Sequence, residues 1–328
     1  MDDIPSTEPV VSVTCITYNQ EDYIAQCLDS LLAQETSFPF EVLVNDDCST
    51  DGTTDIVLSY QQRYPGKVRA VTHDENQYSK GVMPIENFLF PLARGRYLAM
   101  CEGDDYWTDP TKLQRQYDAM QADPTLVACV HANENVQANT GQRITTLRFY
   151  EQDRAVDPSD VISHAQCFST NSLFIRMDAM KSYFDSQIRA VPDDGDHKMM
   201  TFFAITEGGM WYIDRIMSAY RILSKNSINR TTLLSKDRNE RALRRYEARV
   251  ELLRTIDEVT DGRYHDAVTK GIDYMGYVLC KDTRDFRRLR RQWPEQFASE
   301  SLPTKLDSLL YTYCKPLHKL ACAVYFRM

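Results

Sequence analysis

The chain has 328 residues, 43% of them hydrophobic and 26% charged, with a formal net charge of −9. This length suits one large α/β domain with additional helices, or two domains, and the acidic balance argues against a general nucleic-acid binder. The nine cysteines include no C-x-x-C pair, and the first residues, MDDIPSTEP, are polar and acidic, unlike a secretory leader. No apolar run approaches the ~18 residues that a membrane span needs. These features favour a protein with free thiols in a reducing cytoplasm over a secreted or membrane-spanning protein.

The first 72 residues predict alternating strands and helices. β-branched and apolar runs predict buried strands, and apolar residues spaced three and four apart predict helices that pack on a sheet. Asn19 is a candidate cap for the first helix. The elements expected are strand Val10–Tyr18, helix Tyr23–Leu32, strand Phe40–Val44, helix Thr53–Tyr64 and strand Val68–Thr72. This order predicts a doubly wound, mainly parallel α/β sheet flanked by helices.

The rest of the chain predicts a continuation of this sheet and then a helical region. After a polar loop at Asp74–Pro84 we expect strands at Tyr97–Cys101, Leu126–His131, Ile144–Phe149, Gln166–Ile175, Met210–Ile213 and Met217–Arg221. Helices are expected at Ile85–Ala93, Pro110–Gln121, Met177–Phe184, Lys198–Glu207, Arg238–Val259, Tyr264–Cys280, Thr283–Gln292 and Leu309–Phe326. We therefore expect a main domain at 1–230 and a smaller helical domain at 231–328.

Three acidic clusters follow predicted strands or precede a helix: Asp46-Asp47, Asp104-Asp105, and Asp193, Asp194 and Asp196. Open α/β sheets bind ligands at the carboxyl ends of their strands, and a divalent cation on a diphosphate needs few protein carboxylates. Each cluster also has an ordinary explanation as a turn, a helix cap or a partner of a helix dipole. The clusters alone leave both interpretations open.

Three ordered segments together resemble glycosyltransferase family 2, which has the GT-A fold: VSVTCITYNQEDYIAQCLDSLLAQ, EVLVNDDCSTDGT and GRYLAMCEGDDYWTDP. The resemblance covers roughly residues 10–225. It implies transfer of a sugar from a nucleotide-sugar donor with inversion at the anomeric carbon.

The resemblance also implies roles at the nucleotide site. Thr17 and Tyr18 would line the base pocket, Asp47 would accept a hydrogen bond from the base, and Asp46 would support that turn. Lys80, in the loop after the third strand, is a candidate for adding positive charge at the diphosphate.

The remaining implied roles concern the metal and the chemistry. Asp104 would lie near the ribose, with a second possibility at the metal, and Asp105 would hold Mn²⁺ or Mg²⁺. Asp196 matches the catalytic base, with Asp194 as the alternative, because an inverting displacement needs a carboxylate to take the acceptor's proton. Trp107 is a candidate for stacking on an acceptor sugar, although such residues are as often packed in a core.

One segment departs from the family pattern. Many relatives continue Tyr-Arg-x-His after the last core strand, and this chain has Leu223 where the histidine stands. Leu223 cannot bind a metal, so the expected metal ligands are Asp105, the diphosphate and water. Ser224 or Asn226 could take the place of the histidine. Strict metal dependence is therefore left open.

The C-terminal helices carry two basic groups, Arg241, Arg244, Arg245 and Arg249, and Lys281, Arg284, Arg287, Arg288, Arg290 and Arg291. The first interpretation is a solvated face paired with Glu240, Glu247 and Glu251. The second is contact with an anionic membrane surface, to which the amphipathic Leu309–Phe326 segment would add. We therefore expect a cytoplasmic protein, either free or peripheral on the inner face of the membrane.

Three functions are compared. The first is an inverting glycosyltransferase that uses a nucleotide-diphosphate-sugar, foremost a UDP-sugar, and a glycan or lipid-linked acceptor in surface polysaccharide synthesis. A sugar-phosphate nucleotidyltransferase is disfavoured, because Asn19-Gln20-Glu21-Asp22 follows the first strand in place of a glycine-rich phosphate loop. A non-catalytic nucleotide- or glycan-binding relative is the third, motivated by the missing histidine.

Overall fold

A computed structural model describes residues 8–164, 166–192, 195–222, 224, 237–314 and 317 of the chain. It divides into two compact units. The first unit takes its described residues from Met1–Val161, Gln166–Ala190 and Asp196–Thr231, and the second from Ile162–Ala165, Val191–Gly195 and Thr232–Met328. The domain boundary predicted at residue 230 falls in the stretch 225–236, outside the described residues.

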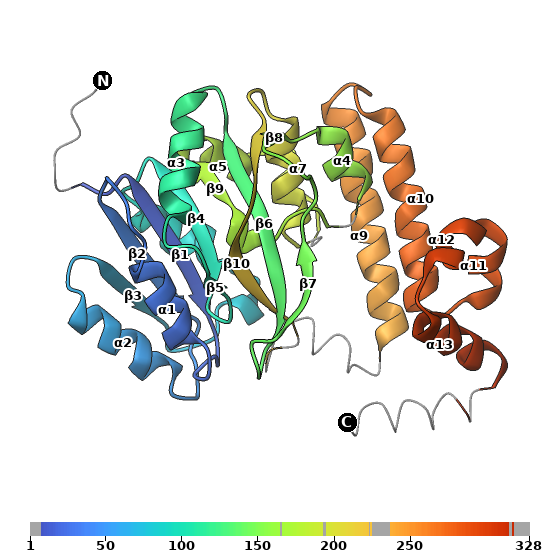
Figure 1. Cartoon of the computed structure of the whole chain (residues 1–328), viewed down its shortest axis with the longest axis horizontal. Coiled ribbons are helices and arrows are strands. Elements are labelled where there is room, and N and C mark those ends of the chain that lie inside the picture. Colours follow the sequence, from blue (N-terminus) through green and yellow to red (C-terminus); the bar gives the residue numbers. More distant parts are fainter. Residues whose placement is uncertain are drawn as a thin grey trace. The chain divides into compact units, whose positions relative to one another are not determined.

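The first unit is built on one mixed, largely parallel sheet (Figure 1). Its main path runs β3-β2-β1-β4-β9-β6-β10-β5, with β7 paired to β6 and β8 to β10. The neighbours β3, β2, β1 and β4 are parallel, as are β6 and β10, while β9, β5, β7 and β8 pair antiparallel. The strands are β1 Val11–Thr17, β2 Phe40–Asp46, β3 Val68–Thr72, β4 Tyr97–Glu102, β5 Tyr106–Trp107, β6 Ala128–Gln137, β7 Arg143–Leu147, β8 Arg154–Ala155, β9 Phe174–Arg176 and β10 Met210–Ile222.

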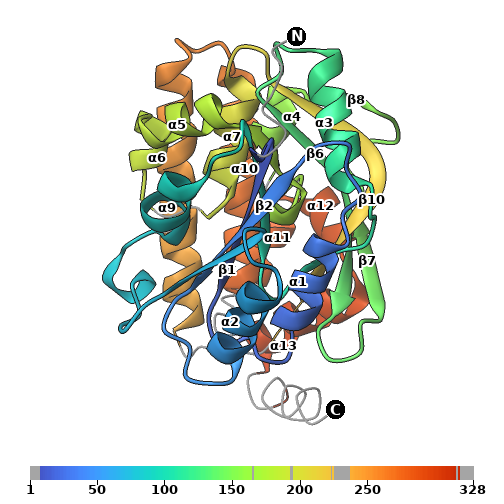
Figure 2. The ribbon, with the colours of Figure 1, turned by 90° about the vertical axis from the view of Figure 1, so that its left-hand side faces the viewer.

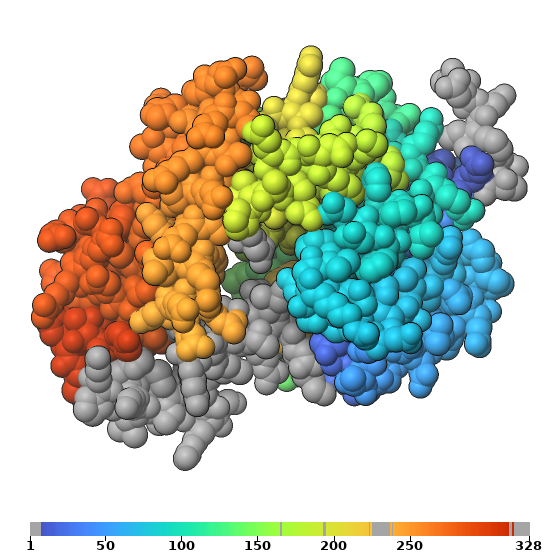
Figure 3. Space-filling model, turned by 180° about the vertical axis from the view of Figure 1, so that it is seen from behind, coloured from blue at the N-terminus to red at the C-terminus, as the bar shows by residue number. Residues whose placement is uncertain are grey.

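Helices cover this sheet, and α1 and α2 pack beside one another along its first strands (Figure 2). The helices with residues in this unit are α1 Ile24–Leu32, α2 Thr53–Arg63, α3 Lys112–Ala122, α4 Pro158–Ser163, α5 Met177–Phe184, α6 Gln187–Ala190 and α7 His197–Ile205. Short 3₁₀ turns occupy Tyr78–Lys80, Phe90–Leu92 and Thr170–Ser172, and a π turn occupies Ile85–Leu89. Figure 3 shows the segment between β3 and β4, in cyan, on the surface of this unit.

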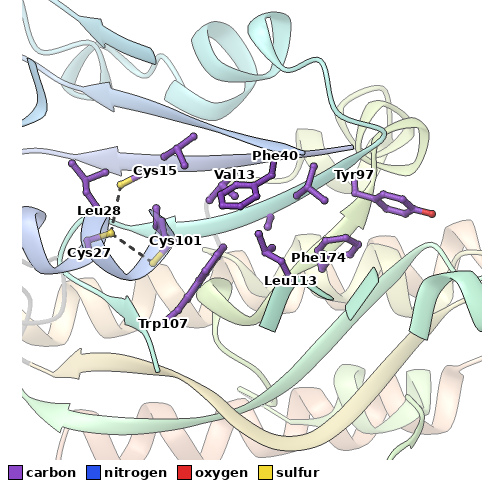
Figure 4. Packing of buried hydrophobic residues seen from close by; sticks show 14 of the residues in the cluster. Val13, Cys15, Cys27, Leu28, Phe40, Tyr97, Cys101, Trp107, Leu113 and Phe174 are labelled. Atoms are coloured by element: carbon purple, nitrogen blue, oxygen red, sulfur yellow. Dashed lines mark hydrogen bonds between the residues drawn. The ribbon is translucent and has the colours of Figure 1, made fainter. Parts of the chain in front are cut away.

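The core of the first unit lies between the first strands and α1. β1 is buried along almost its whole length, as its β-branched sequence VSVTCIT predicts, and α1 turns Ile24, Cys27, Leu28 and Leu31 inward. Cys27 lies between two strand thiols, with its Sγ 3.8 Å from Cys15 and 3.8 Å from Cys101 (Figure 4). All eight cysteines in the described part of the chain are free thiols.

The segment predicted as one strand, Gln166–Ile175, is mostly not a strand. Only its end belongs to β9, and Thr170–Ser172 forms a 3₁₀ turn. Local side-chain hydrogen bonds explain this, because Ser169 Oγ donates to Asn171 Oδ1 over 2.6 Å and Ser172 Oγ donates to the Ser169 carbonyl over 2.6 Å. Such bonds offer the backbone an alternative to a sheet ladder.

Three smaller predictions also differ. The helix expected at Ile85–Ala93 is a π turn followed by a 3₁₀ turn, where Pro91 lacks the N–H that a continued helix needs. Asn19 does not cap α1, whose N-cap position is Tyr23. The two strands expected at Met210–Ile213 and Met217–Arg221 are one strand with register shifts between Ile213 and Ser218.

The second unit consists of helices. α9 Arg238–Val259 pairs with α10 His265–Asp282, and the shorter helices α11 Phe286–Gln292, α12 Pro294–Ser299 and α13 Leu302–Tyr313 follow. Gly271 lets α10 approach Leu253 of α9 closely, since a Cβ there would lie 3.2 Å from its side chain. None of the described helices is long and apolar enough to cross a membrane.

Two predictions for this unit are corrected. Arg249 is not on a solvated face: it is buried, and its Nη2 donates to the His164 carbonyl over 2.9 Å. The helix expected at Leu309–Phe326 begins earlier, at Leu302, and residues 315–316 and 318–328 lie outside the described part.

Lys112, the first residue of α3, is fully buried beside the Trp107 ring. Its Nζ lies 4.0 Å from the ring centroid and donates to Gln116 Oε1 over 2.8 Å. Burial lowers the pKa of Lys112 from 10.5 to about 7. The unfolded chain therefore binds the Lys112 proton more tightly than the folded chain.

We accordingly expect the free energy of unfolding of the wild type to rise with pH above about 7, relative to Lys112→Met. The gain would be on the order of 2–4 kcal/mol by pH 10, because each pKa unit corresponds to about 1.4 kcal/mol. Urea denaturation of both proteins at several pH values measures this difference. Loss of the Gln116 hydrogen bond would lower the stability of Lys112→Met by the same amount at every pH. If the difference in free energy of unfolding between the two proteins does not change with pH, the lowered pKa of Lys112 is contradicted.

Candidate functional site

The loops after β1 and β2 are held together at the carboxyl edge of the sheet. Asn19 has a left-handed backbone (φ 51°), and its Oδ1 accepts a 2.7 Å hydrogen bond from the Thr50 N–H. The Gln20 N–H donates to Thr53 Oγ1, and the Gly52 N–H donates to Glu21 Oε2, each over 2.8 Å. The acidic loop after β2 is thereby fixed beside the end of β1, where ligands of open α/β sheets bind.

Asp46 and Asp47 are both buried in this loop and have distinct partners. Asp46 accepts hydrogen bonds from the hydroxyls of Ser49 and Thr54. Asp47 accepts from the backbone N–H groups of Gln77 (2.7 Å) and Tyr78 (3.0 Å). Asp47 therefore fixes the start of the loop after β3, and a base would share these oxygens with two backbone donors.

The other nucleotide-site candidates lie in different surroundings. Thr17 is buried at the end of β1, and its Oγ1 donates to Gln20 Oε1 over 2.8 Å. Tyr18 follows it with 42% of its surface exposed. Lys80 forms an exposed ion pair with Glu75 in the loop after β3. The ion pair keeps Lys80 within its own loop.

Gly103 brings the end of β4 against the end of β1. Its N–H donates to the Ile16 carbonyl over 2.9 Å. A Cβ at this position would lie 2.5 Å from Gln20 Oε1 and 2.8 Å from Thr17 Oγ1, so only glycine fits. This contact places the carboxylates at 102–105 next to the loop after β1.

Asp104 and Asp105 point to different partners. Asp105 is fully buried, and its two oxygens accept from Asn171 Nδ2 (2.7 Å) and the Arg221 N–H (2.9 Å). Burial, together with the charges of Asp104 and Glu102, raises the pKa of Asp105. Asp104 is only partly buried, and one of its oxygens accepts from the Ser224 hydroxyl.

Glu102, the last residue of β4, is a site residue that the sequence analysis missed. Burial and the charges of Asp196 and Asp104 raise its pKa to about 8. Its Oε2 is buried without a hydrogen-bond partner among the described residues. An unpaired buried carboxylate oxygen beside two further carboxylates is an arrangement that a bound cation would stabilise.

Asp196 comes from a segment about ninety residues later in the chain and joins this cluster. It is the N-cap residue of α7, is exposed, and accepts a hydrogen bond from Thr170 Oγ1. Its charge acts on both Glu102 and Tyr220. The predicted base and the predicted acidic pair are therefore close in space.

The 3₁₀ turn Thr170–Ser172 connects the two acidic groups. Thr170 holds Asp196, and the next residue, Asn171, holds Asp105; Ser218 Oγ in turn donates to Asn171 Oδ1 over 2.7 Å. The sequence analysis missed both residues because it assigned this segment to a strand. The available signal was Ser-Thr-Asn-Ser at 169–172, a cluster typical of turns.

Arg221 of β10 and Ser224 just after it contact the acidic cluster. The Arg221 guanidinium lies between the rings of Tyr23 (5.0 Å) and Tyr106 (4.6 Å) and donates to the Asp104 carbonyl. The Ser224 hydroxyl donates to Asp104. Leu223 and Asn226 lie outside the described residues.

Two further predicted site residues are Trp107 and Asp194. Trp107 does not present its ring to an acceptor: it is 4% exposed, packs in the hydrophobic core, and carries the Lys112 ammonium on its ring. This corrects the prediction that Trp107 stacks on a sugar. Asp194, the alternative base, lies outside the described residues.

The described residues contain no group of three or more His, Cys, Asp or Glu side chains arranged to hold a metal ion. Mg²⁺ on a nucleotide needs less than this, because one or two carboxylates, phosphate oxygens and water complete its coordination. Glu102 and Asp104 fit such a minimal site better than Asp105, whose two oxygens already accept protein hydrogen bonds.

Comparison with known sequences supports the family resemblance. Residues 12–181 match the family model described as glycosyl transferase family 2. The chain is 45% identical over 121 residues to an uncharacterized protein of Mycobacterium tuberculosis, covering 37% of this chain and 34% of that protein. It is 33% identical over 114 residues to the Escherichia coli UDP-Glc:alpha-D-GlcNAc-diphosphoundecaprenol beta-1,3-glucosyltransferase WfaP, covering 35% and 42%. The chain thus spans less than half of the length of these relatives.

Solved structures resemble the fold over most of the chain. S. aureus TarS in complex with UDP-GlcNAc has a TM-score of 0.57 at 18% identity, covering 91% of this chain and 79% of that one. The mannosyltransferase PcManGT from Pyrobaculum calidifontis, in complex with GDP-Man and Mn²⁺, has a TM-score of 0.55 at 19% identity, covering 94% and 81%. Both support a GT-A fold. The match to the family model, over more than half of the residues, shows that the chain belongs to glycosyl transferase family 2.

Proposed function

We propose that this protein is an inverting glycosyltransferase that moves a sugar from a nucleoside-diphosphate-sugar to a glycan or lipid-linked acceptor in surface polysaccharide synthesis. The observation that supports the proposal is the 3₁₀ turn Thr170–Ser172 at the carboxyl edge of the sheet, where Thr170 donates to Asp196 and Asn171 donates to Asp105. One reaction needs both groups: a carboxylate to accept a proton, and carboxylates near the leaving diphosphate.

Asp196 is the proposed catalytic base. It is the exposed member of the cluster, and the Thr170 hydroxyl fixes one of its oxygens. Its carboxylate would take the proton from an acceptor hydroxyl as the acceptor oxygen attacks the anomeric carbon. Attack from the face opposite the diphosphate inverts the configuration. Asp194 stays the alternative.

Glu102 and Asp104 are the proposed carboxylates for Mn²⁺ or Mg²⁺, which when bound would neutralise charge on the departing diphosphate. This moves the predicted metal ligand from Asp105 to its neighbours, because Asp105 is committed to Asn171 and Arg221. Asp105 then acts as a positioning residue that fixes the turn bearing Asp104. Ser224 would hold Asp104 where many relatives use histidine.

The donor is proposed to be a UDP-sugar. WfaP is named for UDP-Glc and TarS was solved with UDP-GlcNAc, while PcManGT carries GDP-Man, which is the alternative. Thr17, Tyr18 and Asp47 are the proposed base-site residues, with Asp46 supporting their loop. Lys80 would reach the diphosphate only after leaving Glu75.

The acceptor is proposed to be a growing glycan carried on a lipid diphosphate, as in the name of WfaP. A cytoplasmic protein peripheral on the inner membrane face would meet such an acceptor. In this proposal residues 1–230 form the transferase domain, and the helices of 231–328 make the membrane contact.

The proposal predicts that a nucleoside diphosphate stabilises the folded protein more in the presence of Mn²⁺. We expect UDP with Mn²⁺ to raise the melting temperature, and Asp104→Asn or Glu102→Gln to remove the metal-dependent part, because a ligand of the folded state stabilises it by mass action. Thermal shift with UDP, GDP, CDP, ADP and TDP, each with and without Mn²⁺, measures this.

Asp118→Asn is the matched control, since this exposed aspartate of α3 in the same unit only accepts from Gln114 Nε2, and an asparagine oxygen can still accept that bond. It should respond to UDP and Mn²⁺ as the wild type does. If no nucleotide shifts the melting temperature, the glycosyltransferase proposal fails and a glycan-binding relative takes its place. If a nucleotide binds but Mn²⁺ adds nothing, only the metal assignment fails.

A further inference from the structure

The last described helix of the second unit, α13, exposes its apolar face and packs its polar face against its own unit. Leu302, Leu306, Leu309 and Tyr313 recur at positions i, i+4, i+7 and i+11 and form one apolar stripe along the helix. This stripe faces outward: Leu302 is 68% exposed and Tyr313 58%. A surface helix of a globular protein ordinarily buries such a stripe, so its exposure calls for a partner.

The opposite, polar face of α13 is the one that packs on its own unit. Ser308 is 1% exposed, Asp307 accepts a 2.6 Å hydrogen bond from Arg284 Nε, and Thr312 Oγ1 donates to the Arg284 carbonyl. The Arg284 guanidinium also lies 5.2 Å from the Tyr311 ring. These contacts fix the rotation of the helix, so the outward direction of the leucines is set by packing.

Basic side chains adjoin one end of the stripe. The Arg287 guanidinium of α11 lies 5.5 Å from the centroid of the Tyr313 ring, and Phe286 packs edge-on against the same ring. α11, α12 and α13 form one group at the end of α10 (Figure 1). The Arg290 guanidinium lies 5.7 Å from the centroid of the Phe286 ring, so Arg287, Arg290 and the leucine stripe are parts of one surface.

The charges of this surface are unbalanced. Nearby acids are already paired, Glu300 with Lys281, Asp307 with Arg284, and Asp282 with Arg245. Among the residues that the structure describes, no ion pair is formed by four exposed arginines of α11, Arg287, Arg288, Arg290 and Arg291. Among the described residues of this region, the acids outside an ion pair are Asp273, which accepts from Trp293 Nε1, Asp285, which caps α11 through the Arg288 N–H, and Glu295. Positive charge remains, although the whole chain carries −9.

We infer that the stripe of α13 and the arginines of α11 form a face that docks on an anionic lipid bilayer. A helix lying in the plane of a membrane buries leucines and an aromatic ring in the acyl boundary while arginines contact lipid phosphates. A second copy of this chain would bring its own arginines against the same arginines, and their mutual repulsion makes it the less suitable partner. The inference deepens the proposed membrane contact and does not depend on the sugar-transfer chemistry.

Flotation of the full chain with lipid vesicles tests this docking face, and no donor is needed. We expect the wild type to float with phosphatidylcholine vesicles that contain phosphatidylglycerol, to float much less with phosphatidylcholine alone, and to be released by salt. Arg287→Gln/Arg290→Gln should lower the partition coefficient about 25-fold, since each arginine near the surface contributes about fivefold. Leu306→Glu/Leu309→Glu should abolish flotation.

Two matched controls lie at the other end of the α9–α10 pair, away from Arg245 and Asp282, which adjoin α11. Val259→Glu changes an exposed apolar residue, and Arg254→Gln/Arg263→Gln removes two exposed arginines. Both should float as the wild type does, and thermal melts should show every variant folded. Absence of flotation with anionic vesicles, equal flotation with neutral vesicles, or equal loss in the controls would overturn the inference. A wild-type dimer in sedimentation that Leu306→Glu/Leu309→Glu dissociates, without vesicle capture, would assign the face to a second copy.

Discussion

Replacing Asp196 with asparagine is expected to lower the rate of sugar transfer by about 10²–10⁴-fold, the usual contribution of a general base. An asparagine keeps an oxygen that can accept the Thr170 hydroxyl, so the turn that holds residue 196 should persist. It cannot accept the acceptor's proton. The affinity for nucleoside diphosphate should stay unchanged, because the base contacts the acceptor side.

The comparison uses the nucleotide-sugar whose diphosphate stabilises the protein, with release of nucleoside diphosphate as the rate measurement. Asp178→Asn is the control, because Asp178 is another exposed aspartate at the start of a helix, α5, in the same unit. If Asp196 only stabilises the N-terminus of α7, both variants should keep most of the wild-type rate. A rate within threefold of the wild type for Asp196→Asn would contradict its role as base.

The second large effect is expected at Asn171. Changing it to aspartate replaces the Nδ2 donor, 2.7 Å from Asp105 Oδ2, with a second carboxylate oxygen in a fully buried position. We expect the free energy of unfolding to fall by about 3–5 kcal/mol, the range found when a buried charge loses its partner. Urea denaturation near neutral pH measures it.

A reciprocal exchange separates this contact from general damage. In Asp105→Asn/Asn171→Asp the amide and the carboxylate change places. The amide introduced at position 105 can donate to the carboxylate introduced at position 171 and still accept from the Arg221 N–H, and Ser218 can still donate to the side chain at position 171. The double variant should regain most of the lost stability. Asn87→Asp, at an exposed amide, should change it by less than about 0.5 kcal/mol. A double variant no more stable than Asn171→Asp would disprove the pairing.

Local sequence determined most of the elements of both units. β-branched runs and three-and-four spacing are properties of a short segment, so strand Val68–Thr72 and helices Met177–Phe184 and Arg238–Val259 have their predicted bounds. The three quoted segments determined the family, because each carries a strand, the polar turn after it and the start of the next element. Parallel strands end at one edge, so the sequence also indicated that Asp47 and Asp104 would lie there.

Tertiary structure decided which carboxylate does what. In the sequence Asp104 and Asp105 are equivalent neighbours, and Glu102 is the end of a strand. The partners that distinguish them lie 66 residues away at Asn171, 116 at Arg221 and 120 at Ser224. Burial and long-range donors set the charge state and freedom of each group, and no local pattern encodes either.

The same reason explains why other predictions from the sequence were wrong. Trp107 and Arg249 are surface candidates by residue type, but packing from distant segments buries both. α13 is amphipathic by sequence, and the pattern cannot say which face meets the unit. The contacts of Arg284 with Asp307, Tyr311 and Thr312 decide it and turn the leucines outward. Periodicity thus determined that a helix has two faces, and tertiary contacts determined which of them is available to a partner.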